Sequence, residues 1–479
     1  MSFEIPDVMP ALPEIFILSM ACIILVVDLF LSKTSRGATY MLSQATLIIA
    51  VLITVATFTK VPVLTFSDTF VRDGIADLLK IAVYIATFMV FLYAKDYLKD
   101  RGLFKGEFYT LGLFAVLGMM VLISAHNLLT IYLGLELLSL SLYAMVAMHR
   151  NSAQASEAAM KYFVLGAIAS GMLLYGMSMI YGITGSLDLA EINANAANVS
   201  DQLILVFGIV FLLIGVAFKL GAVPFHMWVP DVYHGAPTAV TIFIGSAPKL
   251  AAFAMLMRLL IDGLGTVSAQ WQDILILLVL LSLAVGNIVA IAQVNIKRML
   301  AYSTISHIGF LMLGVVAGTE EGVSASMFYA ITYTLMSLGA FAMIILLSRK
   351  GFEAEKLDDF KGLNQRSPWY AFLMLILMFS MAGVPPFLGF WAKFSVLSAV
   401  ISVDLVWLAV ASVIFSIIGA FYYLRVIKIM YFDNAESNET IRCSKDMSLL
   451  ISVNALAVLL IGLFPDELLS LCLKVVTAS

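Results

Sequence analysis

The sequence predicts an all-α polytopic membrane protein with about 14 transmembrane helices. Of its 479 residues, 62% are hydrophobic and 12% are charged, and the mean hydropathy is +1.03. Apolar runs of about 20 residues recur along the chain, which is the length that a helix needs to cross the hydrocarbon core of a bilayer. The runs are continuous, whereas a membrane β-barrel gives short segments of alternating hydrophobicity.

The connections between the predicted spans are too short to form a soluble domain, and the longest polar stretches lie near 349–367 and 433–447. The first apolar run is long enough to cross the membrane, so we expect it to be a span and not a removable targeting segment. The predicted spans are 12–31, 39–59, 75–94, 107–125, 127–148, 157–184, 203–223, 237–262, 272–293, 299–317, 322–347, 368–400, 403–431 and 447–473.

Lysine and arginine are distributed unevenly between the two sets of connections. If the N-terminus lies outside, 18 of the 27 lysines and arginines fall on the inside and four on the outside. The positive-inside rule therefore predicts that both termini face the outside, in agreement with an even number of spans. The other five basic residues lie within spans: Lys80, Lys161, Lys219, Lys249 and Lys393.

Prolines interrupt two of the predicted spans. Pro224 closely follows Lys219, and Pro385 and Pro386 precede Lys393. Proline removes a helix hydrogen bond, and broken helices in corresponding positions of two halves mark ion sites in transporters built from inverted repeats. We therefore expect an N-terminal three-helix segment, two inverted five-helix repeats and a C-terminal helix in one membrane domain, bounded as 1–106, 107–262, 263–431 and 432–479. The alternative is that these are ordinary prolines of membrane helices.

Four ionisable residues lie deep in predicted spans: Glu136, Lys219, Lys249 and Lys393. A charge at the bilayer centre costs roughly 2.5–3.5 kcal/mol on insertion scales, so such residues point to a function. Desolvation favours the neutral amine, which lets a buried lysine take up and release protons near working pH. Two alternatives stay open: the lysines snorkel to an interface, or Glu136 belongs to a structural ion pair.

Three further residues are weaker candidates for proton transfer: Lys161, His226 and His307. Histidine titrates near neutral pH and suits proton transfer, although a lone membrane histidine also serves as a hydrogen-bonding strut between helices. Lys161 lies near the start of its span, where snorkelling explains it as well as function does. Hydroxyl groups that would order water near these residues, or pack helices together, belong to Thr130, Tyr132, Ser303, Thr304 and Tyr333.

The sequence lacks the motifs that bind nucleotides and redox cofactors. There is no GxGxxG after a strand, no P-loop, no CxxC set and no paired-histidine haem signature. The three cysteines, Cys22, Cys443 and Cys472, have no metal-ligand spacing. We therefore expect no nucleotide, iron–sulfur cluster, haem, metal or nucleic acid to bind this chain.

Three features resemble the antiporter-like (Mrp-type) membrane subunits of the respiratory NADH–quinone oxidoreductase, complex I. They are Glu136 in the fifth span and the runs KLGAVPFHMWVPDVYHGAPT (219–238) and GVPPFLGFWAKF (383–394). The resemblance covers most of the chain, from the fourth to the thirteenth span. The first run is highly specific for a superfamily that also includes subunits of multisubunit sodium/proton antiporters. A lysine at 393 in place of a glutamate, and about 14 spans without a long lateral amphipathic helix, favour one member of the family.

The resemblance implies roles for the deep residues: Glu136 and Lys219 as a coupled ion pair, Lys249 as the central relay and Lys393 as the distal relay. It implies secondary positions on the same polar axis for Lys161, His226, His307 and Lys297. Lys297 lies at the inner end of its predicted span, where the excess of positive charge expected on the inside is enough to explain a lysine.

The resemblance also implies that the chemistry of electron transfer takes place elsewhere. Electrons would pass from NADH through FMN and iron–sulfur clusters to quinone in other subunits, and this chain would respond electrostatically and pump protons. The implied partners are the other membrane subunits, including antiporter-like subunit M and the small membrane subunits, within the lipid bilayer. The implied location is the inner (plasma) membrane of a bacterium, with both termini on the periplasmic side.

Two other functions remain open from the sequence. The chain is either a subunit of a cation/proton antiporter that works without electron transfer, or a spacer whose buried charges only fix helix register. A sodium site would require more intramembrane carboxylates than Glu136 provides. Several lysines at depth disfavour the spacer.

Overall fold

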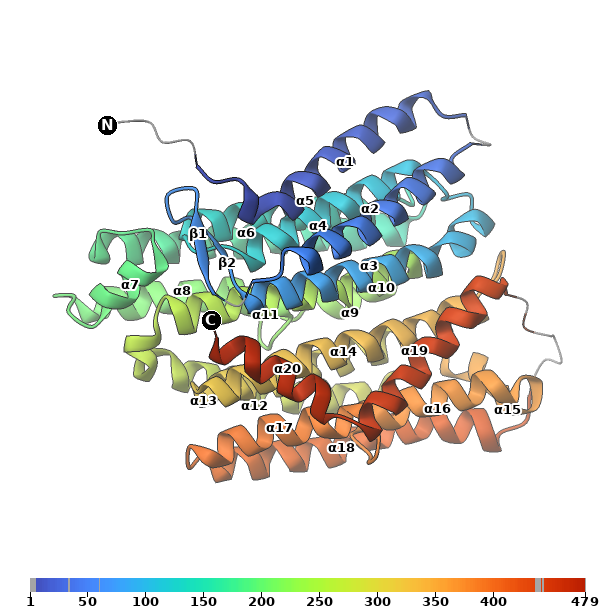
Figure 1. The fold of residues 1–479 in the computed structure, drawn as a ribbon. Helices are drawn as coiled ribbons and strands as arrows, with labels where there is room; N and C mark the ends of the chain where they lie inside the picture. The colour runs from blue at the N-terminus through green and yellow to red at the C-terminus, as the bar shows by residue number, and fades with distance from the viewer. Residues whose placement is uncertain (1–5, 33–34, 60, 436–440, 442, 479) are drawn as a thin grey trace.

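The computed structural model describes residues 6–32, 35–59, 61–435, 441 and 443–478. Its helices run side by side along one axis and form an elongated bundle (Figure 1). Among the described residues, 13 helices are long and apolar enough to cross a membrane by length and composition, and two shorter apolar helices, Pro368–Ala382 and Leu388–Ser402, follow one another in sequence. The predicted all-α membrane fold is confirmed.

The N-terminal part consists of three long helices and a small antiparallel hairpin that the sequence did not predict. Asp73 caps the third helix by accepting a hydrogen bond from the Ala76 amide, which satisfies one of the free donors of the first turn. The elements are η1 (Met9–Ala11), α1 (Leu12–Phe30), α2 (Gly37–Ala56), β1 (Val63–Thr65), β2 (Phe70–Arg72) and α3 (Gly74–Asp100).

The next part contains the first predicted break. Its elements are α4 (Gly106–Ile123), α5 (Leu128–Val146), α6 (Ala153–Thr184), α7 (Leu189–Ala196), α8 (Gln202–Leu220), α9 (Trp228–Gly235), α10 (Thr238–Ile244), α11 (Ala247–Met257), η2 (Arg258–Asp262) and η3 (Gly265–Val267). The break separates α8 from α9, as predicted. A further break at Gly245–Ser246, between α10 and α11, was not predicted.

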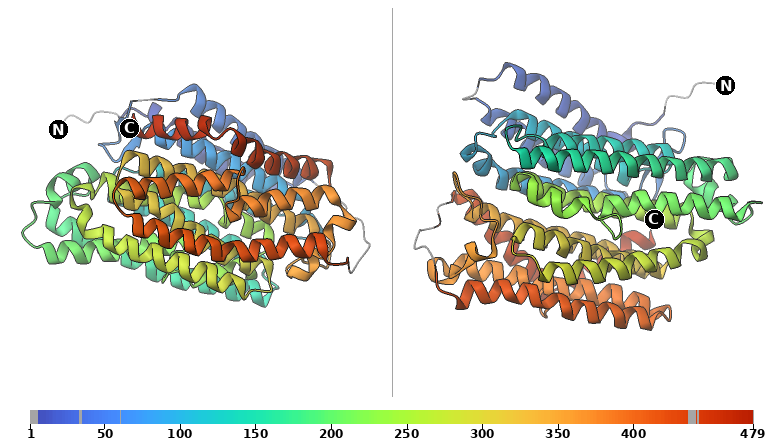
Figure 2. Two further views of the ribbon diagram at one scale, coloured as in Figure 1. Left: turned by 90° about the horizontal axis from the view of Figure 1, so that it is seen from below. Right: turned by 180° about the vertical axis from the view of Figure 1, so that it is seen from behind.

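The C-terminal part contains the second predicted break, between α16 and α17. Its elements are α12 (Ser268–Ile291), α13 (Ile296–Ala317), α14 (Glu320–Leu347), η4 (Leu357–Phe360), α15 (Leu363–Arg366), α16 (Pro368–Ala382), α17 (Leu388–Ser402), α18 (Val406–Phe432), α19 (Lys445–Leu463) and α20 (Asp466–Thr477). α19 and α20 pack against α3 and α14, so the last two helices lie beside a helix of the N-terminal part (Figure 2).

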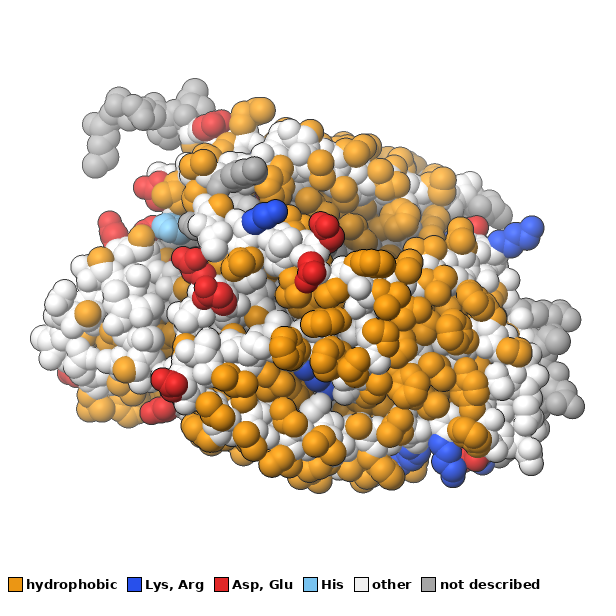
Figure 3. All heavy atoms as spheres, turned by 60° about the horizontal axis from the view of Figure 1, so that its bottom comes forward, with side chains coloured by type: hydrophobic (Ala, Val, Ile, Leu, Met, Phe, Trp, Pro, Cys, Tyr) orange, Lys and Arg blue, Asp and Glu red, His pale blue; other side chains and the backbone are white. Residues whose placement is uncertain are grey.

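Glycines allow the helices to approach closely. A Cβ atom on Gly118 of α4 would lie 2.5 Å from the Leu138 amide nitrogen of α5, and one on Gly286 of α12 would lie 2.6 Å from the Ser306 amide nitrogen of α13. Small residues at such contacts are typical of helix pairs in lipid. Hydrophobic side chains gather on the right and lower parts of the face shown in Figure 3.

The first helix begins and the last helix ends at the same end of the bundle (Figure 1). We call this the outer end, following the predicted orientation, and the opposite end the inner end. The β1–β2 hairpin and α7 also lie at the outer end. Three residues that contribute to the predicted charge asymmetry, Lys33, Lys60 and Arg442, lie outside the described residues.

Two buried ion pairs near the outer end join segments that are distant in sequence. Lys80 of α3 contacts Glu14 of α1 at 2.6 Å, and Arg258 contacts Asp73 at 2.6 Å. All four side chains are almost entirely shielded from solvent. Each pair joins segments that are distant in sequence, so it holds α3 in register with its neighbours.

The Lys80–Glu14 pair predicts a clear result in a double-mutant cycle. Lys80→Met leaves an unpaired carboxylate in the interior and should destabilise the fold by about 3–5 kcal/mol, whereas Lys80→Met combined with Glu14→Gln should recover most of this loss. Thermal unfolding of the purified protein in detergent measures both variants. Equal loss in the single and double variants would show that the pair is not what stabilises this contact.

Candidate functional site

The first part of the site lies between α5, α6 and α8. Lys219 is 6% exposed, and its Nζ donates to Ser139 Oγ at 2.9 Å. Glu136 is half-buried and accepts a hydrogen bond from Ser170 Oγ. Among the described residues, no ion pair within 4.0 Å joins Glu136 to Lys219.

A small cavity lies next to this lysine. Ser139, Ser170 and Lys219 line it, and its volume is about 10 Å³, close to the space that one water molecule occupies. Ser170 binds Glu136, so the two serines and a single water can link the carboxylate to the ammonium group.

At the first break, a second lysine binds the open end of a helix. α8 ends with Gly221 in the left-handed conformation (φ +85°), and Lys249 Nζ donates to the Leu220 carbonyl at 2.8 Å. Lys249 is 1% exposed and lies over the Trp228 ring. A cation at a helix C-terminus is stabilised by the helix dipole and by the free carbonyls.

The second break repeats this arrangement. α16 ends with Gly383 in the left-handed conformation (φ +87°). Lys393 Nζ donates to the Ala382 carbonyl and to Ser416 Oγ, both at 2.9 Å, and lies over the Phe310 ring. Each break therefore places a lysine ammonium on the last carbonyl before a left-handed glycine.

A hydrogen-bonded network lies between the two breaks. His307 Nδ1 lies 2.7 Å from the Tyr329 hydroxyl and its Nε2 lies 3.0 Å from the Tyr423 hydroxyl. Tyr423 also bonds Ser303, and the Tyr329 ring stacks on Phe310, the ring beneath Lys393. Hydrogen bonds thus join α13 to α14 and α18, and Phe310 gives this network a ring contact, not a hydrogen bond, to Lys393.

A parallel contact lies one turn away on α13. The hydroxyls of Thr304 and Tyr333 are 2.7 Å apart. The helices that carry all these groups are in contact from α5 through α6, α8, α11, α14 and α13 to α17 and α18. We call this series of titratable and hydroxyl groups on neighbouring helices the central line.

This chain matches the family described as "NADH:quinone oxidoreductase/Mrp antiporter, TM" over residues 125–419. It is 62% identical to NADH-quinone oxidoreductase subunit N of Thioalkalivibrio sulfidiphilus, with 98% of each chain covered. It is 58% identical to subunit N of Thiobacillus denitrificans, again with 98% of each covered. The chain belongs to the subunit N family of NADH-quinone oxidoreductase.

The fold agrees with this family. A chain of respiratory complex I from Thermus thermophilus superimposes with a TM-score of 0.83 at 29% identity, covering 96% of this chain and 99% of that chain. Lys393, which favours one member of the complex I subunits, indicates subunit N, and the relatives confirm it.

Three residues that the resemblance to this family implies as secondary members lie off the central line. Lys161 is exposed at the side of α6, where it contacts Asp231 and Glu157 at 2.8 Å each. His226 is half-buried in the loop after the first break. Lys297 is buried at the inner end of α13 and donates to the Ala236 carbonyl at 3.2 Å. His307, in contrast, lies at the centre of the network.

Only some of the hydrogen-bond partners of the deep ionisable residues were detectable from sequence spacing. Ser139 lies three residues after Glu136, a spacing that puts both on one helix face, so it was detectable. Ser170, Ser416, Tyr329 and Tyr423 lie on other helices, and no sequence spacing connects them to Glu136, Lys393 or His307. Their positions follow from packing alone.

Proposed function

We propose that this chain is the proton-translocating subunit N of an NADH-quinone oxidoreductase. In this proposal, electron transfer from NADH to quinone occurs in other subunits, which hold the FMN, the iron–sulfur clusters and the quinone, and this chain contains no redox site. The observation that carries the proposal is the pair of broken helices, each with a buried lysine bound to its terminal carbonyl.

The lysine contacts provide a physical basis for switching. A lysine ammonium is stabilised by the helix carbonyl, while burial favours the neutral amine. A change of charge on one group therefore alters the proton affinity of the next. Glu136 and Lys219 form the first coupled pair, Lys249 is the central relay and Lys393 is the distal relay. Lys249 binds the carbonyl of Leu220, the residue next to Lys219, so these two lysines are directly linked.

The hydroxyl network supplies the connection from α13 to the distal lysine. His307 has a hydroxyl partner on each ring nitrogen, which suits it to receive a proton on one side and release it on the other. Tyr329 and Phe310 continue the contact to Lys393.

Tyr423→Phe tests this connection. The change removes the hydroxyl that bonds both His307 and Ser303 and keeps the ring. Because a hydrogen bond contributes about 0.5–1.5 kcal/mol, NADH-driven proton translocation should fall about three- to tenfold. The measurement is the initial rate of interior acidification in inverted vesicles. Tyr181→Phe, at an exposed position of α6, is the control, and equal rates in the two variants would contradict the role of the network.

The two five-helix repeats, 107–262 and 263–431, are part of this proposal, flanked by 1–106 and 432–479. Two observations support them. Both breaks have the same cap geometry, and a proline follows each left-handed glycine at the same distance, Pro224 after Gly221 and Pro386 after Gly383. α8 reaches its break from the outer end and α16 reaches its break from the inner end (Figure 1), as an inverted repeat requires.

The proposed location is the inner membrane of a bacterium, with both termini on the periplasmic side. The start of α1 and the end of α20 at one end of the bundle support this orientation. The proposed partners are the other membrane subunits of the complex, among them antiporter-like subunit M. Glu136 is half-buried at the side of the bundle, so a neighbouring subunit can approach it.

The competing function is a cation/proton antiporter subunit, because the matched family includes Mrp antiporters. The two functions can be separated by comparing a strain that lacks this chain with the same strain after the gene is restored. The proposed function predicts that NADH-driven acidification of inverted vesicles disappears and returns, while succinate-driven acidification is unchanged. Sodium/proton exchange that depends on this chain and proceeds without NADH would instead establish the antiporter.

A further inference from the structure

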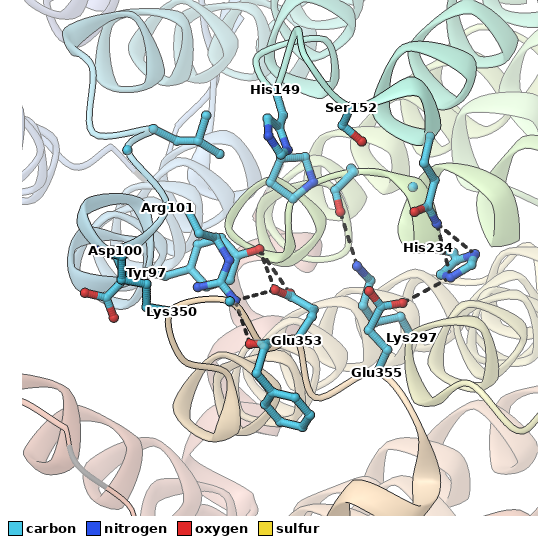
Figure 4. A pocket seen from close by; sticks show the side chains of 18 of the residues that line it. Tyr97, Asp100, Arg101, His149, Ser152, His234, Lys297, Lys350, Glu353 and Glu355 are labelled. Atoms are coloured by element: carbon cyan, nitrogen blue, oxygen red, sulfur yellow. Dashed lines mark hydrogen bonds and ion pairs between the residues drawn. The ribbon is translucent and has the colours of Figure 1, made fainter.

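A cavity of about 680 Å³ opens at the inner end of the bundle. It lies where the end of α3, the start of α6, the end of α9, the start of α13 and the loop after α14 meet. Figure 4 shows the side chains that surround it. The cavity is large enough for many water molecules, and it lies apart from the line of lysines described above.

Lys297 forms the floor of this cavity. It is 2% exposed and lies in the first turn of α13, where the positive end of the helix dipole disfavours a second positive charge. Its Nζ contacts the Ala236 carbonyl. The charges of Glu353 and Glu355 act on it from the cavity wall.

Glu355 and His234 form a pair at the edge of the cavity. His234 Nε2 lies 3.1 Å from Glu355 Oε2, and Asn295 Nδ2 donates to the same oxygen at 3.0 Å. Burial raises the pKa of Glu355, but the hydrogen bond from His234 and the charges of Lys297 and His234 outweigh it and hold the pKa below its usual range. The carboxylate is therefore ionised at neutral pH and lies within hydrogen-bond distance of the His234 ring.

Unlike Glu355, Glu353 holds the cavity wall in place. Contacts from two other elements fix its carboxylate. Its carboxylate accepts from the Tyr97 hydroxyl at 3.0 and 3.1 Å, from Thr238 Oγ1 and from Arg101. The backbone of the same loop is bound to α13 through Ile296 N and the Glu355 carbonyl at 2.7 Å. The cavity wall is therefore a fixed structure that holds His234 and Glu355 over Lys297.

A path leads inward from the floor. Thr304 and His307 follow Lys297 on α13, and Thr304 lies two turns further on the same face. Both belong to the central hydroxyl contacts. Thr304 and His307 therefore lie on the helix that leads from the cavity floor to the middle of the bundle.

We infer that this cavity is the site where the subunit takes up protons from the inner side, with the His234–Glu355 pair as the collecting group and Lys297 as the first internal acceptor. The neutral His234 ring accepts a proton from water. The resulting imidazolium gives that proton through cavity water to the neutral amine of Lys297, and the ring returns to its neutral form. Glu353 positions the wall. The inference rests on the proposed proton-translocating function.

The titratable and charged groups that face the cavity come from every element around it. They are Tyr97, Lys99, Asp100 and Arg101 of α3, His149 before α6, His234 of α9, Lys297 of α13, and Lys350, Glu353 and Glu355 of the loop after α14. The basic groups offset the acidic ones, so the cavity holds no large net charge that would block the entry of a proton.

The test compares Glu355→Gln and Lys297→Met with Glu107→Gln in inverted vesicles that contain the assembled complex. Glu107 is an exposed carboxylate at the inner start of α4, outside the cavity. The two cavity variants should lower NADH-driven acidification about threefold to tenfold. The loss should grow as the external pH rises from 6 to 8, because protons become scarcer and unaided uptake slows. Imidazole added outside should restore part of the rate to Glu355→Gln.

Two outcomes overturn the inference. The first is that both cavity variants acidify the vesicles as fast as Glu107→Gln does at every pH. The other is a loss that neither changes with pH nor responds to imidazole, which indicates a structural role. If Lys297→Met fails to assemble, Glu355→Gln decides alone, since it keeps the size of the side chain. Lys249→Met measured in parallel separates this inference from the proposed function. Normal pumping by Lys249→Met refutes the function, whereas blocked pumping with normal cavity variants refutes the uptake site alone.

Discussion

Lys219→Met is expected to abolish most of the NADH-driven acidification of inverted membrane vesicles and to slow quinone reduction with it, each by at least about tenfold. Lys219 is buried, and Ser139 and a cavity next to Ser170 connect it to Glu136. Methionine keeps the length of the side chain and removes the group that carries the proton. Both rates fall together if electron transfer is obligatorily coupled to the charge state of this chain.

The same change should leave the complex assembled. Lys219 makes no ion pair within 4.0 Å among the described residues, and the half-buried Glu136 keeps its hydrogen bond from Ser170. The substitution therefore leaves no closely paired charge without its partner. Native gel electrophoresis checks assembly. Lys428→Met, at a position whose side chain is 70% exposed, is the control and should pump normally. Unchanged acidification and quinone reduction in Lys219→Met would refute the proposed polar line.

Gly383→Ala is expected to lower proton translocation about tenfold through its effect on Lys393. A Cβ atom at this position would lie 2.9 Å from Lys393 Cδ and 3.2 Å from Nζ. The lysine side chain is flexible, so it moves in preference to the backbone and loses its hydrogen bond to the Ala382 carbonyl. Loss of a hydrogen bond to a charged group costs about 1.5–3 kcal/mol, which corresponds to this decrease in rate.

Gly185→Ala separates this effect from backbone strain. Gly185 also caps a helix in the left-handed conformation, at φ +75°, and nothing lies within 4 Å of a Cβ atom there. Both substitutions incur the strain of about 1–2 kcal/mol that a non-glycine residue meets in this conformation. Thermal unfolding should therefore shift similarly in both variants, while acidification should fall only in Gly383→Ala. A similar fall in both would attribute the effect to strain and not to Lys393.

The sequence alone determined the architecture, because membrane insertion imposes strong local constraints. A helix of about 20 apolar residues is required to cross the bilayer, and most of the predicted spans agree with the helices observed. Three predicted spans are wrong as single helices: 237–262 is divided into α10 and α11, 368–400 into α16 and α17, and 447–473 into α19 and α20. Prolines identified the two breaks at Pro224 and Pro385, since proline cannot donate the helix hydrogen bond. The break at Gly245–Ser246 escaped prediction because no proline precedes it within α10.

The candidate site was predicted in part. The cost of burying charge singled out Glu136, Lys219, Lys249 and Lys393 from composition and position alone. What each lysine binds depended on tertiary structure. Lys249 reaches a carbonyl 29 residues earlier, and His307 is held by a tyrosine 116 residues later. The cavity beside Lys297 likewise requires α3, α9 and the loop after α14 to meet. Periodicity reports only which face of a helix is apolar, and it carries no information about which helices become neighbours. The ionisable residues were thus visible in the sequence, and helix packing alone decided their partners.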